Sequence, residues 1–111
     1  MEAYVDAVRE LSRAAFGQKY RLECMLAIAE SGDGMVTLST LAKALDVSTS
    51  NVQDPIKALL ATGLISPLDS GDSRSKFYVR NASSAWEWCR ELAQRARETA
   101  MLHQDEPSRS T

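Results

Sequence analysis

The sequence has few of the residues on which metal sites and disulfide frameworks depend. Its 111 residues include two cysteines, Cys24 and Cys89, and one histidine, His103. Cysteine and histidine alone cannot supply a four-ligand structural zinc site from this inventory, and one distant cysteine pair is a poor disulfide framework. Both cysteines lie in apolar helical patterns, where cysteine behaves as a small hydrophobic residue. We therefore expect no bound metal and no cofactor.

Long apolar runs and enzyme motifs are also missing. No stretch approaches the roughly 18 consecutive apolar residues of a membrane span, and the start, MEAYVDAVRE, lacks the basic and apolar regions of a secretory signal. There is no glycine-rich phosphate loop, G-x-S-x-G or H-E-x-x-H motif. These absences predict a cytoplasmic protein that has no membrane contact and is not an enzyme.

The composition is that of one globular domain, with 44% hydrophobic and 25% charged residues. We place this domain at residues 1–103 and expect the polar tail, residues 104–111, to be disordered. The net charge of −2 argues against an indiscriminate polyanion binder. Residues 37–80 hold five basic and four acidic side chains and so sum to +1, whereas residues 1–36 sum to −2 and 81–111 to −1. The charge distribution weakly favours an anionic partner for the central segment.

Hydrophobic periodicity predicts a mainly α fold with a small β-hairpin. Helices are expected at residues 2–16 and 18–30, followed by a short strand at 35–36 and a helix-turn-helix at 37–62. A hairpin, which would form a wing, is expected at 64–80. The last helix is expected at 84–101, opened by a capping box that pairs Ser84 with Glu87.

The bend inside the helix-turn-helix has the residue types that such a bend requires. Ala42 is small where the two helices cross, and Val47 fills the turn. Asp46 occupies the strained position, which aspartate tolerates at moderate cost in the left-handed region. Thr37 and Ser48 are the expected N-caps of the two helices, and Gly63 is the expected C-terminal stop of the second helix.

At this point the sequence resembles a known family. The segment LSTLAKALDVSTSNVQDPIKALLATGLI is similar to the helix-turn-helix of winged-helix regulators of the arsenic-resistance-repressor and multiple-antibiotic-resistance-repressor types. The resemblance extends over residues 18–80. It implies a winged helix-turn-helix dimer whose second helix enters the major groove while the wing reaches over the neighbouring backbone. The metal-sensing branch carries cysteines in the helix before the turn, and LSTLAKALD has none.

Helical geometry places one polar face of the second helix outward when Val52 is buried. Hydroxyl, amide and basic side chains of this kind read base edges or hold phosphates in nucleic-acid complexes. The sequence therefore predicts a sequence-specific, double-stranded DNA-binding transcriptional regulator. The candidate DNA-binding residues are Ser48, Thr49, Ser50, Asn51, Gln53 and Lys57 on the helix, and Arg74 and Lys76 in the wing.

The two terminal helices carry apolar stripes that the helix-turn-helix itself does not need. Burial against a second copy is the simplest use of these stripes, which predicts a homodimer on a palindromic operator. Packing back on the chain's own core is the alternative. The predicted interface residues are Tyr4, Val8, Leu11, Trp86, Cys89, Ala93 and Ala96.

Four questions stay open from the sequence: the geometry of the second helix, the kind of partner, redox control and the effector. Asp54 and Pro55 fit a DNA-reading helix poorly: the carboxylate faces the groove, and the proline either kinks the helix or restarts it with Asp54 as cap. Asp54 and the nearly neutral surface favour the alternative of a protein-interaction module with little DNA affinity. An interfacial Cys89 would also permit redox control, and the sequence identifies no small-molecule effector.

Overall fold

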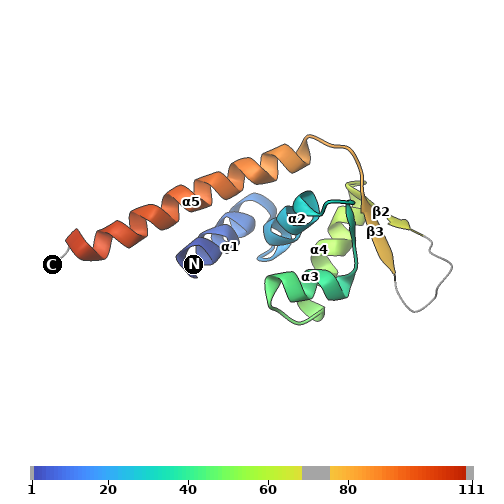
Figure 1. Cartoon of the computed structure of the whole chain (residues 1–111), viewed down its shortest axis with the longest axis horizontal. Helices are drawn as coiled ribbons and strands as arrows, with labels where there is room; N and C mark the ends of the chain where they lie inside the picture. Colours follow the sequence, from blue (N-terminus) through green and yellow to red (C-terminus); the bar gives the residue numbers. More distant parts are fainter. Residues whose placement is uncertain (1, 69–75, 110–111) are drawn as a thin grey trace.

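In the computed structural model, a small sheet lies at one end, and α5 runs from near the sheet past α2 and α1 to the opposite end (Figure 1). The structure describes residues 2–68 and 76–109, and the side chains of 3–68 and 76–102. The elements are α1 (Glu2–Phe16), α2 (Arg21–Glu30), β1 (Met35–Val36), α3 (Leu38–Leu45), α4 (Ser50–Ala61), β2 (Ile65–Leu68), β3 (Phe77–Arg80) and α5 (Ala85–Arg109). The mainly α fold with a β-hairpin wing is confirmed.

The corner between α1 and α2 is built on Gly17 and Ser12. Gly17 ends α1 with a φ of 71°, and its N–H donates to the carbonyl of Arg13 at 2.8 Å. The buried hydroxyl of Ser12 donates to the carbonyl of Gln18 and accepts from the N–H of Leu22 at 3.0 Å. Because residues 18–20 form this corner, α2 starts at Arg21, later than the predicted residue 18.

The wing hairpin is part of a three-stranded antiparallel sheet in the order β1-β3-β2. Met35 pairs with Val79 and Val36 with Tyr78, while Ile65 of β2 pairs with Arg80. The sequence predicts the strands at 35–36 and in the hairpin but not the pairing of β1 with β3. This pairing ties the wing to the segment between α2 and α3.

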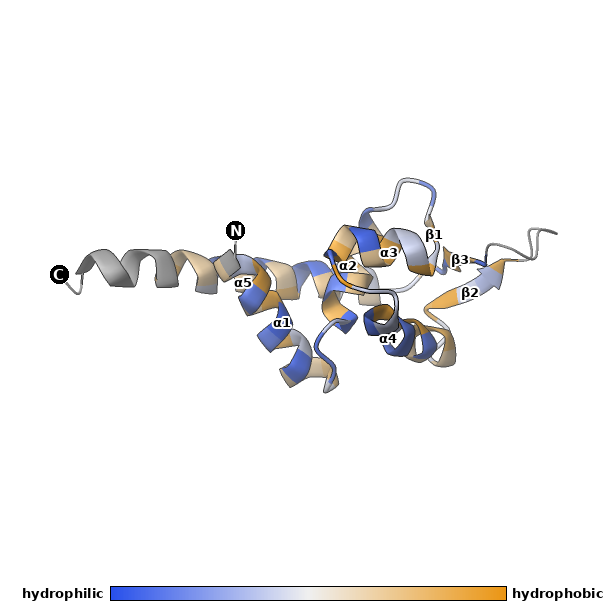
Figure 2. Ribbon diagram, turned by 90° about the horizontal axis from the view of Figure 1, so that it is seen from below, coloured by the Kyte–Doolittle hydropathy of each residue, from blue (hydrophilic) through white to orange (hydrophobic). Residues whose placement is uncertain are grey.

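The stripes of α1 and α5 are buried against each other and against α2 within one chain. Along α1 and α4, Figure 2 shows hydrophobic and hydrophilic residues alternating as amphipathic helices require. Most residues of these stripes are therefore buried within one chain and leave little surface for the predicted second copy, while the dimer interface itself stays a prediction. Tyr4 and Leu11 are half-buried, and the fully buried residues are Val8, Trp86, Cys89, Ala93 and Ala96.

The last helix is longer than predicted and is capped differently. It continues to Arg109, beyond the predicted end at residue 101, while the predicted disorder of the tail from residue 104 stays a prediction. No glycine or proline lies between Ala85 and Glu106 to stop the helix. At its start, the hydroxyl of Ser83 accepts from the N–H of Ala85 at 3.0 Å. None of the described helices combines the length and the apolar character needed to span a bilayer.

Candidate nucleic-acid interface

The bend between α3 and α4 has the predicted geometry. Asp46 is left-handed, with φ 57° and ψ 48°, and is the one non-glycine residue with positive φ in the described part of the chain. Its N–H donates to the carbonyl of Lys43 at 3.2 Å, and that of Val47 to the carbonyl of Ala42 at 3.0 Å. Thr37 caps α3 through a reciprocal capping box with Thr40. The short α3 is therefore fixed at both ends, which orients α4.

The first turn of α4 lacks a side-chain cap. The predicted cap at Ser48 is wrong, because the N-cap residue is Thr49 and no side chain bonds to the free N–H groups there. The Ser48 hydroxyl instead lies 2.9 Å from that of Ser50 and accepts from the Asn51 side-chain amide at 3.3 Å. The turn is tight, since the N–H of Asn51 bonds to the carbonyl of Ser48. The N–H of Val52 bonds to the carbonyl of Thr49 in the same way, so the helix start presents mainly the hydroxyls of residues 48–50 to an anion.

The polar residues singled out on α4 form one exposed face. Val52, Ile56 and Leu59 are buried on the opposite side, as the periodicity predicts. The structure thus brings six of the eight predicted DNA-binding residues together at the N-terminal end and outer side of one helix. The exposed residues are Ser48, Thr49, Ser50, Asn51, Gln53 and Lys57.

Pro55 lies inside α4 without ending it. The helix is continuous from Ser50 to Ala61, so the alternative in which it restarts at Asp54 is wrong. The missing N–H of Pro55 leaves the carbonyl of Asn51 without its usual helical donor. The proline ring is fully buried, and its contact with the core offsets part of this cost.

The electrostatic balance of the exposed face is close to neutral. Lys57 and Asp54 are both exposed on α4. Among the described side chains, the ion pairs join Arg9 to Glu23 at 2.6 Å and Arg95 to Glu91 at 2.9 Å. Neither pair involves α4, so both charges of the face point into solvent.

Of the two wing residues predicted to bind DNA, Lys76 is exposed immediately before β3. Arg74 lies outside the described residues, as do Asp69 and Asp72.

Asn81, which the sequence analysis does not single out, joins the wing to α4. Its side-chain amide donates to the carbonyl of Gly63 at 2.9 Å and to the hydroxyl of Ser66 at 2.8 Å. No local pattern marks this residue, because its partners come from segments 15 to 18 positions away.

Both cysteines are buried thiols. Cys89 donates to the carbonyl of Trp86 at 3.1 Å, and burial raises its pKa to about 11. Burial likewise raises the pKa of Cys24 to about 12. A buried, protonated thiol is a poor nucleophile, so the geometry argues against redox control through Cys89. Within the described residues, no three histidine, cysteine, aspartate or glutamate side chains group as a metal site.

We expect neither thiol to react while the protein is folded. At pH 8, a pKa of about 11 leaves only ~0.1% of Cys89 as thiolate. Modification by an aromatic disulfide reagent should be at least ~100-fold slower in the native protein than in denaturant. The fold disfavours the thiolate, so stability is full below pH 9 and falls as the pH rises towards 11. Rapid stoichiometric modification of the native protein at pH 8 would contradict this expectation.

Comparison with known proteins identifies solved structures that have the same fold. No protein-family model matches the sequence, and no curated protein matches it either. Solved structures do: AbsC, a MarR family transcriptional regulator from Streptomyces coelicolor, has a TM-score of 0.65 at 22% identity, over 92% of this chain and 71% of that one. Sco3205 from the same organism, solved in complex with DNA, has a TM-score of 0.66 at 20% identity, over 98% and 74%.

A MarR family regulator from Silicibacter pomeroyi has a TM-score of 0.60 at 21% identity, over 96% of this chain and 67% of that one. The chain is thus shorter than the regulators that it resembles. At this level of identity the likeness shows the fold, which is the winged helix of the MarR family regulators and the one that the helix-turn-helix segment predicts.

Proposed function

We propose that the protein is a sequence-specific, double-stranded DNA-binding transcriptional regulator that acts in the cytoplasm as a homodimer. In this proposal α4 enters the major groove and the wing lies on the flanking backbone. The observation that carries it is the exposed face of α4, where Asn51 and Gln53 offer amides that match adenine edges. Lys57 offers a cation for a phosphate or a guanine. The likeness to a regulator solved in complex with DNA supports the proposal.

The uncapped start of α4 has a defined part in this function. The exposed hydroxyls of Ser48, Thr49 and Ser50, at the positive end of the helix dipole, would bind one backbone phosphate. Such a contact fixes the register of the helix in the groove but carries no sequence information. Specificity would then depend on Asn51 and Gln53.

One observation favours a second candidate function, a winged-helix module that binds protein. Asp54 is exposed on the same helix as Lys57 and would repel phosphate. A surface of this balanced charge suits a protein partner as well as it suits DNA.

The salt dependence of duplex binding separates the two functions. Each phosphate contact made by a cation contributes ~0.9 to the slope of log affinity against log salt, because binding releases counterions. We expect a steep slope for a duplex selected from a random pool, lowered by ~1 in Lys57→Ala and, for the wing, in Arg74→Ala. Absence of binding to every duplex in the pool would favour the protein-interaction module.

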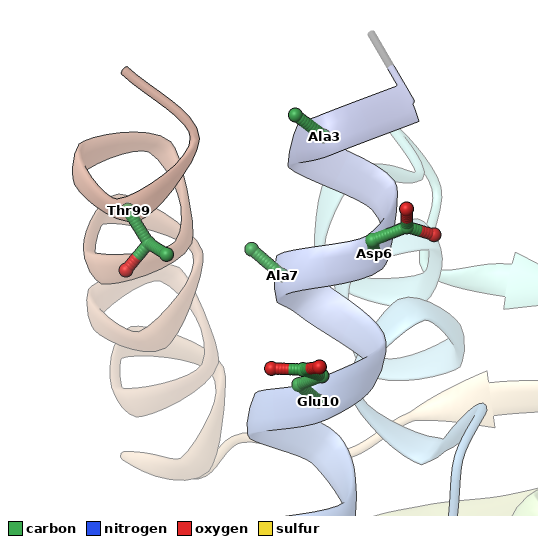
Figure 3. A pocket seen from close by; sticks show the side chains of 5 residues that line it. All are labelled: Ala3, Asp6, Ala7, Glu10 and Thr99. Carbon is green, nitrogen blue, oxygen red and sulfur yellow. The ribbon is translucent and has the colours of Figure 1, made fainter. Parts of the chain in front are cut away.

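The dimer needs a surface other than the predicted stripes, and the C-terminal part of α5 offers one. Met101 and Leu102 are each 64% exposed, the highest exposure of any described large hydrophobic residue. Near them lies a groove of about 260 Å³ between α1 and α5, lined by the small residues Ala3, Ala7 and Thr99 and by the carboxylates of Asp6 and Glu10, which a partner copy would have to pair or leave in solvent (Figure 3). Small side chains of this kind allow a second helix to approach closely. We propose that the partner copy covers this end of the molecule.

Solution mass tests the dimer. The chain has a mass of 12.2 kDa, so light scattering should give ~24 kDa at micromolar concentration. Replacing both Met101 and Leu102 with aspartate should shift the mass to that of a monomer, because the interface would then bury two carboxylates. Leu68→Asp, which changes an exposed leucine in the wing, is the matched control and should leave the mass unchanged. A monomeric wild-type protein would refute the dimer.

A further inference from the structure

The C-terminal end of α2 is held by an arginine from the wing. One guanidinium nitrogen of Arg80, Nη1, donates to the carbonyls of Ile28 at 2.7 Å, Ala29 at 3.2 Å and Ser31 at 3.0 Å. These carbonyls lie at and just beyond the end of α2, where the regular helical donors run out. The carbonyl of Ile28 also accepts from the N–H of Ser31 at 3.2 Å, and that of Ser31 from the N–H of Gly34 at 3.3 Å. A charged donor shared by several carbonyls at a helix C-terminus is a strong contact, since the helix dipole is negative there.

The sequence of α2 makes this contact necessary. Its last turn contains no basic residue, and Glu30 adds a negative charge at the negative end of the dipole. The compensating charges come from far along the chain. Arg80 of β3 supplies one, and Arg90 of α5 supplies a second through a bond from its Nη2 to the carbonyl of Ala29 at 3.0 Å.

The backbone around Gly34 is shaped to let Arg80 pass. Gly34 has a φ of +73°, and its carbonyl accepts from the N–H of Arg80 at 2.8 Å. A Cβ at this position would lie 3.4 Å from the Cβ and Cζ atoms of Arg80. The carboxylate of Asp33 accepts from the N–H of Met35 and from the hydroxyl of Ser31, both at 3.0 Å, which lowers the pKa of Asp33. These hydrogen bonds hold the loop at residues 31–35 in the conformation that leaves room for the Arg80 side chain.

Arg80 is placed so that its anchor sets the position of the wing. It ends β3, the middle strand of the sheet, which pairs with both β1 and β2. Lys76, the described wing residue proposed to bind DNA, immediately precedes the same strand. We infer that Arg80 is a positioning residue for DNA binding, which holds β3 against the end of α2 so that Lys76 reaches the backbone while α4 occupies the groove. This inference rests on the proposed function.

Arg90 provides a matched control for Arg80. Both arginines donate to the carbonyl of Ala29, but Arg90 belongs to α5, whereas Arg80 belongs to the strand β3 of the wing. A variant at either position removes a cation from the end of α2, and only the variant at Arg80 releases β3. Effects confined to Arg80→Ala therefore report the position of the wing rather than the stability of α2.

A double-mutant cycle on duplex affinity tests the inference. We expect Arg80→Ala to weaken binding about tenfold and to abolish the effect of Lys76→Ala, which in the wild type should weaken binding roughly threefold and lower the salt slope by ~1. The effect of Lys57→Ala should persist unchanged in the Arg80→Ala background, because α4 keeps its place. Arg90→Ala should leave the effect of Lys76→Ala intact. A full effect of Lys76→Ala in the Arg80→Ala protein would overturn the inference.

Hydrogen exchange tests the anchor without DNA and so separates this inference from the proposed function. Amides of residues 77–80 should exchange at least ~10-fold faster in Arg80→Ala than in the wild type or in Arg90→Ala. If Arg80→Ala does not fold, Arg80→Lys, which keeps the charge with a less rigid donor, should show the same pattern at reduced size. Unchanged exchange in β3 would overturn the inference even if DNA binds. Failure of the wild type to bind any duplex, with β3 loosened as expected, would instead overturn the proposed function.

Discussion

Lys57→Glu is expected to weaken binding to a selected duplex by roughly thirtyfold or more. The substitution removes a charged contact worth about 1.5–3 kcal/mol and places a carboxylate beside Asp54, on the face that would approach the phosphates. The side chain is exposed and Ile56 and Leu59 hold α4 in the core, so the folded structure should be unaffected. A titration of labelled duplex at fixed salt, with circular dichroism as a check on folding, measures the effect.

Lys19→Glu is the matched control for this experiment. Lys19 lies in the corner between α1 and α2, with its ammonium 5.3 Å from the Tyr20 ring, and has no proposed part in binding. Both substitutions replace +1 with −1 and take the net charge from −2 to −4. Long-range repulsion by the whole protein is therefore the same in the two variants. Equal losses of affinity would show that net charge, and not the face of α4, governs binding.

The turn of the helix-turn-helix could be predicted because its rules are local. A residue that tolerates positive φ, a small residue at the crossing and apolar residues on either side are read directly from neighbouring positions, and Asp46, Ala42 and Val47 satisfy them. The cap of α4 was missed by one residue. Three consecutive hydroxyl residues at 48–50 are all acceptable N-caps, and only the tight first turn decides which one occupies the position.

The contacts that set the angle between wing and body could not be predicted. The side chains of Arg80 and Asn81 bond to backbone carbonyls, and a carbonyl carries no sequence signature. A two-residue strand such as β1 has no pattern that identifies its partner. Gly34 was the one available signal, because a glycine in a loop can mark a backbone that another chain segment approaches closely.

The terminal helices show a different limit. An apolar stripe indicates that one face of a helix is buried, but it does not indicate which other part of the protein or which partner covers that face. Tyr4, Val8 and Leu11 fit a dimer interface and a chain core equally well from their spacing alone. In a single chain, the packing of α1 on α5 and α2 buries Val8 and half-buries Tyr4 and Leu11. The surface left for a second copy is then the exposed end of α5 rather than its stripe.

Trp86→Ala is expected to destabilise the protein by about 3–5 kcal/mol. The indole is buried where α5 begins, and its Nε1–H donates to the carbonyl of Asn81 at 2.7 Å. Truncation leaves a cavity and an unpaired carbonyl at the joint between the wing and α5. Trp86→Phe keeps most of the packing but removes the hydrogen bond. The free energy of unfolding should therefore fall by about 1 kcal/mol more than the smaller buried area alone would explain. Denaturant unfolding followed by circular dichroism gives both values.

Trp88→Ala is the control, since it changes the same residue type two positions along the same helix. Trp88 is 44% exposed and contacts Phe16 edge to face at 5.3 Å, an arrangement worth about 0.5–1.5 kcal/mol. The difference between the two alanine variants therefore measures burial in the chain's own core. If Trp86 instead lay in a dimer interface, Trp86→Ala would lower stability by weakening the association of the two copies. Dilution would then lower the unfolding midpoint of the wild type towards that of the variant. A difference that is independent of protein concentration is the result that the packing of α5 on α1 and α2 requires.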